Sequence, residues 1–170
     1  MKQNVTIIGI SGASASGKSL LANTIVDELG SDQVAIIAQD SYYKDRSDIP
    51  FEERAHINYD HPDAFDLDLL VEQLDELQQS KQVNVPGYDH SIHNRGKETQ
   101  SVGPHKIIII EGIMLFIEKR MRDLMDIMIY MDTPLDICLI RRLKRDILER
   151  DRDVDSVITQ YQNTVRPMYF

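Results

Sequence analysis

Hydrophobic residues occur along this chain in short runs that end at small or acidic residues. There are four such runs: one begins at Val5, and the other three lie within Val34–Asp40, Lys106–Gly112 and Asp126–Met131. Short apolar runs rich in β-branched residues are typical of strands in a parallel sheet, and the four consecutive isoleucines of Lys106–Gly112 indicate a strand buried on both faces. The pattern predicts a parallel sheet of at least four strands.

Segments with the apolar spacing of amphipathic helices lie between and after these runs. They are Leu20–Leu29, Asp66 to about Gln79, a segment following Thr133, and Val154–Val165. Asp66 is expected to cap the second helix. For the third, Thr133 is expected to be the cap, with Pro134 at the first helical position and Asp136 closing the capping box. Alternating strands and helices predict an α/β fold with three layers.

The hydrophobic period changes to two between Lys81 and Pro104, where alternating valines flank a polar loop. This predicts a β-hairpin flap over about residues 82–103. Its tip is expected to carry Tyr88, His90, His93 and Arg95, and an ordinary exposed polar loop is the alternative. The irregular segment Ile49–Phe65, rich in histidine and aromatic residues, is expected to be a substrate-binding loop.

A phosphate-binding motif follows the first apolar run. Residues Gly12, Ala13, Ser14, Ala15, Ser16, Gly17, Lys18 and Ser19 fit the pattern G-x-x-x-x-G-K-[ST]. The glycines let backbone N–H groups and the helix N-terminus surround phosphate oxygens. Lys18 is placed to neutralise the β- and γ-phosphates, and the Ser19 hydroxyl to join the shell of a magnesium ion. The motif predicts a nucleoside triphosphate as ligand.

Two carboxylates end predicted strands, Asp40 the second and Glu111 the third. Ligands of open α/β sheets bind at the carboxyl ends of the strands, so both acids are candidates for chemistry there. Glu111 is a candidate magnesium ligand, directly or through water. Roles as turn or capping acids are the alternatives for both residues.

Composition limits the classes of function. At 170 residues and 42% hydrophobic, the chain is expected to form a single domain, 1–170. No apolar run approaches the length of a membrane span, so a soluble, cytoplasmic protein without a membrane partner is expected. The lone cysteine, Cys138, excludes a disulfide framework. A net charge of −9 argues against nucleic acid as a partner. The basic segment Arg141–Arg152 suits a small polyphosphate, or is simply a solvated charged face.

Several segments together resemble one family. GASASGKS, QDSYYKD, NYDHPDAFD, YDHSIHNR, IIIIEGI, DTPLDICLIRRLKRDILERDR and TQYQNTVRPM are similar to segments of the uridine kinases (uridine/cytidine kinases), bacterial type, of the phosphate-loop kinase superfamily. The resemblance covers essentially the whole chain. It implies phosphoryl transfer from ATP, or alternatively GTP, with Mg²⁺, to the 5′-hydroxyl of uridine or cytidine in pyrimidine salvage. It also implies feedback by CTP or UTP and a homotetramer.

The resemblance also implies a role for each site residue. Asp40 matches the general base and, with Ser19 and Glu111, organises magnesium. Asp60 and Arg142 match ribose-binding positions, and Tyr88 and His93 match pyrimidine-contacting positions. The remaining matches are Arg152 and Gln160 on the substrate side and Arg145 and Arg150, which resemble the phosphate-facing lid.

Three departures from the family pattern bear on these expectations. His90 stands where Tyr or Phe is common against the base, and Asp151 stands where glycine is usual. Family members also continue past the RPM segment with a strand, a nucleotide-contacting loop and a helix that this sequence lacks. Two alternatives therefore stay open: a truncated nucleotide-binding module with little or no turnover, and a related kinase of the phosphoribulokinase or pantothenate kinase type. A GTPase is disfavoured because no N-K-x-D stretch is present.

Overall fold

A four-stranded parallel sheet forms the centre of the molecule. The computed structural model describes residues 5–54 and 56–169. The sheet contains β1 (Thr6–Gly12), β2 (Val34–Ala38), β5 (Ile107–Gly112) and β6 (Ile127–Met131), in the order β2-β5-β1-β6. The predicted parallel sheet is confirmed. Because β1 and β5 are the two central strands, the loops that follow them lie side by side at one edge of the sheet.

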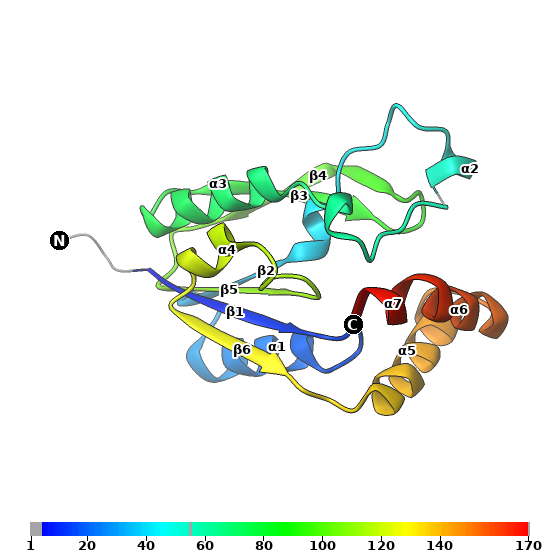
Figure 1. Ribbon diagram of the computed structural model, residues 1–170. Coiled ribbons are helices and arrows are strands. Elements are labelled where there is room, and N and C mark those ends of the chain that lie inside the picture. Colours follow the sequence, from blue (N-terminus) through cyan, green and yellow to red (C-terminus); the bar gives the residue numbers. More distant parts are fainter. Residues whose placement is uncertain (1–4, 55, 170) are drawn as a thin grey trace.

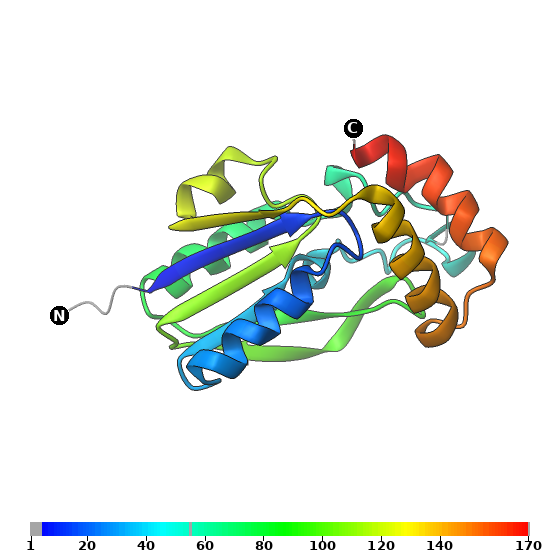
Figure 2. The same ribbon diagram turned by 90° about the horizontal axis from the view of Figure 1, so that it is seen from below.

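Helices cover both faces of this sheet, which confirms the predicted three layers (Figures 1 and 2). Helix α1 (Lys18–Leu29) lies on one face, and α3 (Leu67–Gln78) and α4 (Lys119–Leu124) lie on the other. The isoleucines of β5 alternate between the two apolar clusters, with Ile109 facing α1 and Ile108 and Ile110 facing α3. Burial on both faces explains why this strand has no polar alternation.

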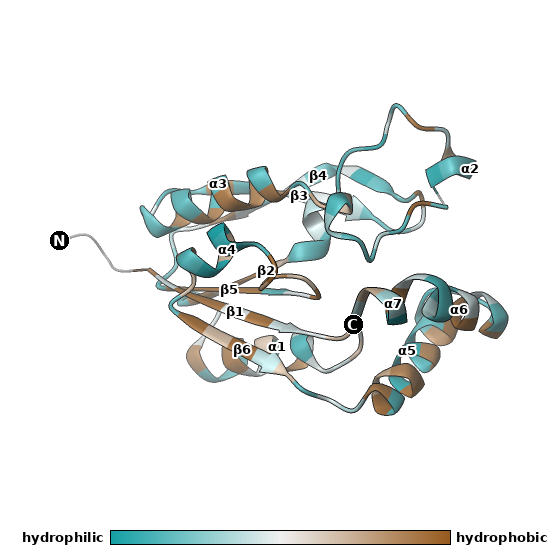
Figure 3. Cartoon of the chain, in the orientation of Figure 1, coloured by the Kyte–Doolittle hydropathy of each residue, from teal (hydrophilic) through white to brown (hydrophobic). Residues whose placement is uncertain are grey.

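The predicted flap is an antiparallel hairpin of β3 (Val83–Asp89) and β4 (Asn94–Val102). Val83, Val85 and Val102 join the apolar cluster that includes α3, so the base of the hairpin is anchored to the core. Figure 3 shows hydrophobic residues along β1 and β6 and mostly hydrophilic residues along β4. The outer part of the hairpin is therefore free to present polar groups.

A second group of helices lies beyond the carboxyl ends of the strands, to the right in Figure 1. It contains α5 (Leu135–Glu149), α6 (Val154–Gln160), a π-helical turn at Tyr161–Val165, and α7 (Arg166–Tyr169). The short elements are the 3₁₀ turns Gln39–Tyr42 and Pro62–Ala64 and the helix α2 (Phe51–Arg54). Among the described residues, no helix is both long and apolar enough to cross a bilayer.

The helix boundaries correct one prediction and confirm another. Asp66 caps α3 as expected, because its side chain accepts a hydrogen bond from the Leu69 N–H. The predicted Thr133 cap is wrong: α5 begins at Leu135 with Pro134 as its cap residue and no capping side chain. The Thr133 hydroxyl instead donates to the Ser16 carbonyl oxygen, 2.9 Å away. A tertiary partner has displaced the local one.

Candidate functional site

The loop between β1 and α1 forms a cradle of small residues. Gly12, Ala15 and Gly17 have φ of 147°, 64° and 102°, a backbone region that glycine adopts far more readily than other residues. A Cβ on Gly12 would lie 2.8 Å from the Met131 carbonyl oxygen, so the backbone approach requires glycine. The buried Ser16 Oγ has no hydrogen-bond partner among the described residues. An unpaired buried hydroxyl in a phosphate loop fits an anion that would complete it.

Charged groups converge at the end of this loop. Lys18 is 7% exposed, and its Nζ donates to the Ala13 carbonyl oxygen at 2.8 Å. Burial lowers the Lys18 pKa, while the carboxylates of Glu111 and Asp40 act in the opposite direction. Burial likewise raises the pKa of Glu111, opposed by Lys18. The structure thus brings together the lysine and the two acids that the sequence placed at separate strand ends.

The Ser19 hydroxyl and Glu111 form the candidate magnesium site. Ser19 Oγ donates to Glu111 Oε1 at 3.1 Å, across 92 residues of sequence. Within the described ranges, no three His, Cys, Asp or Glu side chains gather to hold a metal by themselves. Mg²⁺ in phosphoryl-transfer enzymes takes one or two protein oxygens, with phosphates and water completing its shell. The hydroxyl and carboxylate present fit that requirement.

Asp40 is not in the strand itself. β2 ends at Ala38, and Asp40 lies in the 3₁₀ turn Gln39–Tyr42 that follows. The turn is fixed by the fully buried Gln39, whose Oε1 accepts a hydrogen bond from the Met114 N–H, and by Tyr42, which donates to Gln73 Oε1 at 2.7 Å. The carboxylate is therefore held on a rigid turn beside the phosphate loop.

Asp60, predicted to bind the acceptor, is buried beside the C-terminal helices. This carboxylate is 8% exposed and its Oδ2 accepts a hydrogen bond from the Thr164 hydroxyl at 2.9 Å. Burial raises the Asp60 pKa, and Arg142 opposes that shift. Thr164 lies in the π-helical turn and was not predicted from the sequence. The residues around Thr164 in the sequence do not indicate this contact, because its partner Asp60 lies 104 residues away.

A cavity of about 170 Å³ joins the two sides. Gly12, Ala13 and Ser14 line it from the phosphate loop, and Asp60 and Arg142 line it from the acceptor side. Tyr161 and Tyr169 from the C-terminal helices form part of its wall. A larger hollow of about 340 Å³ lies instead between the start of α3 and the Ile117–Arg120 segment, away from the phosphate loop. The smaller cavity is the candidate site because the anion cradle opens into it.

An aromatic cluster connects the flap with the loops below it. Tyr88 packs against Tyr43 at 4.9 Å between ring centroids and against His90 at 5.1 Å. His93 stacks on Tyr59 at 5.6 Å with an interplanar angle of 21°. Tyr43 is buried beneath this cluster, whereas Tyr88, His90 and His93 are partly or fully exposed and could stack on a planar base. Arg95 lies opposite Tyr88 near the tip of the hairpin, as predicted. Its side chain donates to the Tyr43 carbonyl oxygen and to Asp66 Oδ2, which ties the flap to the cap of α3.

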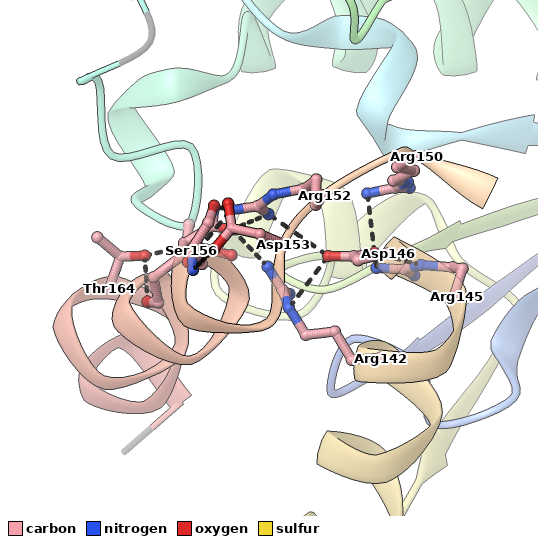
Figure 4. Close-up of polar contacts among 10 residues, drawn as sticks. Arg142, Arg145, Asp146, Arg150, Arg152, Asp153, Ser156 and Thr164 are labelled. Carbon is pink, nitrogen blue, oxygen red and sulfur yellow. Dashed lines mark hydrogen bonds and ion pairs between the residues drawn. The ribbon is translucent and has the colours of Figure 1, made fainter. Parts of the chain in front are cut away.

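The two predicted lid arginines and two arginines predicted on the acceptor side surround one acid, Asp146 (Figure 4). Asp146 is completely buried, and ion pairs join it to Arg142, Arg145, Arg150 and Arg152. Gln160 Oε1 accepts hydrogen bonds from Arg142 and Arg152. Asp146 lies within the basic segment Arg141–Arg152, and its role was not predicted from the sequence. Its neighbours at positions −4, −1 and +4 were the available signal, but that spacing also describes a solvated helix face.

The turn after α5 accounts for an unusual residue. Asp151 has φ of 50°, the left-handed region that aspartate and asparagine enter more easily than other non-glycine residues. The family that this sequence resembles usually has glycine at this position, and glycine adopts the left-handed conformation readily. Asp151 therefore preserves the chain reversal that returns Arg152 to Asp146, where the Arg152 N–H also donates to the Asp146 carbonyl oxygen at 3.1 Å.

Residues 7–170 match the family model described as the Phosphoribulokinase / Uridine kinase family. This chain belongs to that family. It is therefore a phosphotransferase of the phosphate-loop kinase type, whose chemistry implies ATP and typically Mg²⁺. The assignment extends over the phosphate loop, the flap and the arginine helix, so every part of the candidate site lies inside the matched range.

Curated relatives of this family member include uridine kinases. The uridine kinase of Aeromonas hydrophila is 54% identical over 99% of this chain and 80% of its own length, and that of Shewanella amazonensis is 52% identical over 98% and 81%. This chain thus spans about four fifths of each relative. A solved putative fructose transport system kinase from Silicibacter has a TM-score of 0.80 over 98% of this chain and 83% of its own, at 23% identity. That likeness supports the fold.

Proposed function

We propose that this chain transfers the γ-phosphoryl group of ATP to the 5′-hydroxyl of uridine and cytidine. The observation that carries the proposal is the identity above 50%, over nearly the whole chain, to uridine kinases. The site geometry supports it, because an anion cradle and a buried carboxylate pocket open into one cavity. An acceptor hydroxyl and a triphosphate would meet there in the manner that in-line transfer needs.

The donor side is proposed to act through charge. Backbone N–H groups of the phosphate loop hold the phosphates, and Lys18 with Arg145 and Arg150 neutralises charge that develops during transfer. Asp40 accepts the proton of the attacking hydroxyl. Ser19 and Glu111, with Asp40, hold Mg²⁺, which supplies further charge neutralisation when bound.

The acceptor side is proposed to act through hydrogen bonds and ring contacts. Asp60 accepts from the ribose hydroxyls, with Arg142 beside it. Tyr88, His90 and His93 contact the pyrimidine, and Arg152 and Gln160 add substrate-side polar contacts. A histidine at position 90 retains a ring for stacking, and its packing on Tyr88 supports that role.

Further parts of the proposal rest on the family resemblance alone. They are pyrimidine salvage as the pathway, a cytoplasmic location, GTP as a second donor, feedback by CTP or UTP, and a tetramer. A single kinase domain spanning 1–170 is likewise proposed.

The decisive test is ADP release with ATP and Mg²⁺, measured separately with uridine, cytidine, adenosine, ribulose 5-phosphate, pantothenate and no acceptor. Stimulation by uridine and cytidine supports the proposal, and stimulation only by ribulose 5-phosphate or pantothenate would replace it. The Asp40→Asn variant is expected to bind ATP but to lose about 100-fold or more in kcat, the usual contribution of a general base. ATP binding without acceptor-stimulated release would favour the nucleotide-binding module.

A further inference from the structure

One buried carboxylate lies at the centre of the positive charge in this molecule. Asp146 has 0% exposure and faces four guanidinium groups, so it neutralises one of four positive charges. A carboxylate without compensation would be costly at this depth, and four arginines without it would repel one another. The acid and the arginines therefore stabilise each other's positions.

The two oxygens of Asp146 separate the arginines into two pairs. Oδ1 lies 2.8 Å from Arg145 Nη2 and 3.6 Å from Arg150 Nη1. Oδ2 lies 3.7 Å from Arg142 Nε and 3.5 Å from Arg152 Nη1. The first pair contains the arginines assigned to phosphate, and the second contains those assigned to the acceptor.

A second contact keeps the acceptor pair together. Gln160 Oε1 accepts from Arg142 Nη2 at 3.0 Å and from Arg152 Nη1, so the same two arginines share two acceptors. Arg152 also donates to the Ser156 hydroxyl at 2.8 Å, which joins the cluster to α6. Among the described residues, Arg145 and Arg150 have no polar partner other than Asp146. Arg150 is the most exposed of the four side chains, at 38%, and Arg142 the least, at 7%.

We propose that Asp146 is a positioning residue that aligns the phosphate-binding and acceptor-binding arginines with each other. The inference rests on the proposed function and goes beyond it by assigning a role to a residue that touches neither substrate. Because one rigid carboxylate holds both pairs, the arginines reach the transferred group in register with the nucleoside. A carboxamide in its place fills the same volume but holds guanidinium groups far less strongly.

The test compares Asp146→Asn with Glu149→Gln. Glu149 lies on the same helix and is exposed, so its variant makes the same change in charge away from the cluster. In Asp146→Asn, ATP alone is expected to bind as tightly as in the wild type or up to about tenfold more tightly, because the cluster gains net positive charge. Its kcat is expected to fall about 100-fold, the effect of a misplacement of about 1 Å, and its KM for uridine to rise. Glu149→Gln is expected to retain wild-type values.

Either of two results would overturn the assignment. One is a kcat of Asp146→Asn within about threefold of the wild type. The other is weakened ATP binding by Asp146→Asn when its circular dichroism and unfolding midpoint are those of the wild type. If Asp146→Asn does not fold, Asp146→Glu keeps the charge and shifts the oxygens by one methylene. Its kcat is then expected to fall about tenfold at unchanged ATP affinity, and wild-type turnover would contradict the role. If uridine does not stimulate ADP release by the wild type, the proposed function is wrong. The ATP affinity of Asp146→Asn still tests the positioning role in that case.

Discussion

Several ionisable side chains are held where charge is disfavoured. Burial lowers the pKa of Lys18 and raises the pKa of Asp60 and of Glu111. Each of these groups lies at the candidate site, and such shifts often accompany function. The charged forms of these groups therefore destabilise the folded chain at the site, where a bound substrate or metal would compensate their charge.

Replacing Asp60 by Asn is expected to separate stability from binding. A carboxyl whose folded pKa is raised contributes stability below its unfolded value of 3.8, and that stability is lost as pH rises through the folded pKa. Above the folded pKa the loss is complete, so Asp60→Asn should there unfold at higher urea concentration than the wild type. Near pH 3.8 or below, the difference should disappear.

The same variant should bind its acceptor poorly. Loss of hydrogen bonds to a charged group corresponds to an increase in KM for uridine of about 10- to 100-fold. Asp63→Asn is the matched control, because Asp63 lies on the same loop with 89% of its side chain exposed. An unchanged KM in Asp60→Asn would remove Asp60 from the proposed acceptor site.

At the scale of elements, the connection between β6 and α5 supports the phosphate loop. The Thr133 hydroxyl bonds the Ser16 carbonyl oxygen across 117 residues. Thr133→Val keeps the shape and removes the donor, so we expect a loss of about 1 kcal/mol in unfolding free energy and ATP binding several-fold weaker. Calorimetric titration with ATP measures the second effect. Thr133→Ser should behave as the wild type, and equal losses in both variants would exclude the hydroxyl as the cause.

The turn that carries Asp40 packs against the end of β5. A Cβ on Gly112 would lie 2.4 Å from Gln39 Cβ and 2.3 Å from Gln39 Oε1, although its φ is not in the left-handed region. Gly112→Ala should therefore displace the turn, cost about 1–3 kcal/mol in unfolding free energy, and lower kcat. In Gly96→Ala the nearest atom is 3.8 Å away. That variant should lose little in either measurement.

The sequence predicted the elements whose signals are local and failed where the partner is distant. The isoleucines of β5, the glycines of the phosphate loop and the Asp66 cap depend on neighbouring residues, and all of these elements formed as expected. Thr133, Thr164 and Asp146 acquire their partners only when separate segments meet. For the same reason the sequence predicted Arg95 on the flap but not its ion pair with Asp66, which lies in a separate segment.

At the scale of the whole molecule, two flap histidines link stability to pH. Burial lowers the pKa of His90. The positive charges of Arg150, His93 and Arg145 lower it further, and the Asp40 carboxylate opposes the shift. Burial also lowers the pKa of His93. Groups with a depressed folded pKa contribute stability above their unfolded value, here 6.5, and that stability is lost as pH falls through the folded pKa.

The urea midpoint of the wild type is accordingly expected to fall between pH 7.5 and pH 5.5, and His90→Gln should show a smaller fall. Because Asp60 and Glu111 titrate in the opposite sense, the difference between the two proteins is the informative quantity. An identical fall in both would show that His90 does not contribute.

The position of the lone thiol has a practical consequence. Cys138 is 3% exposed, lines the cavity beside the phosphate loop, and has a pKa raised by burial. A buried thiol with a raised pKa reacts slowly, and it reacts only when local opening of the structure exposes it. The chain therefore carries a natural chemical reporter: the rate of its modification would follow the opening of the cavity without any engineered label.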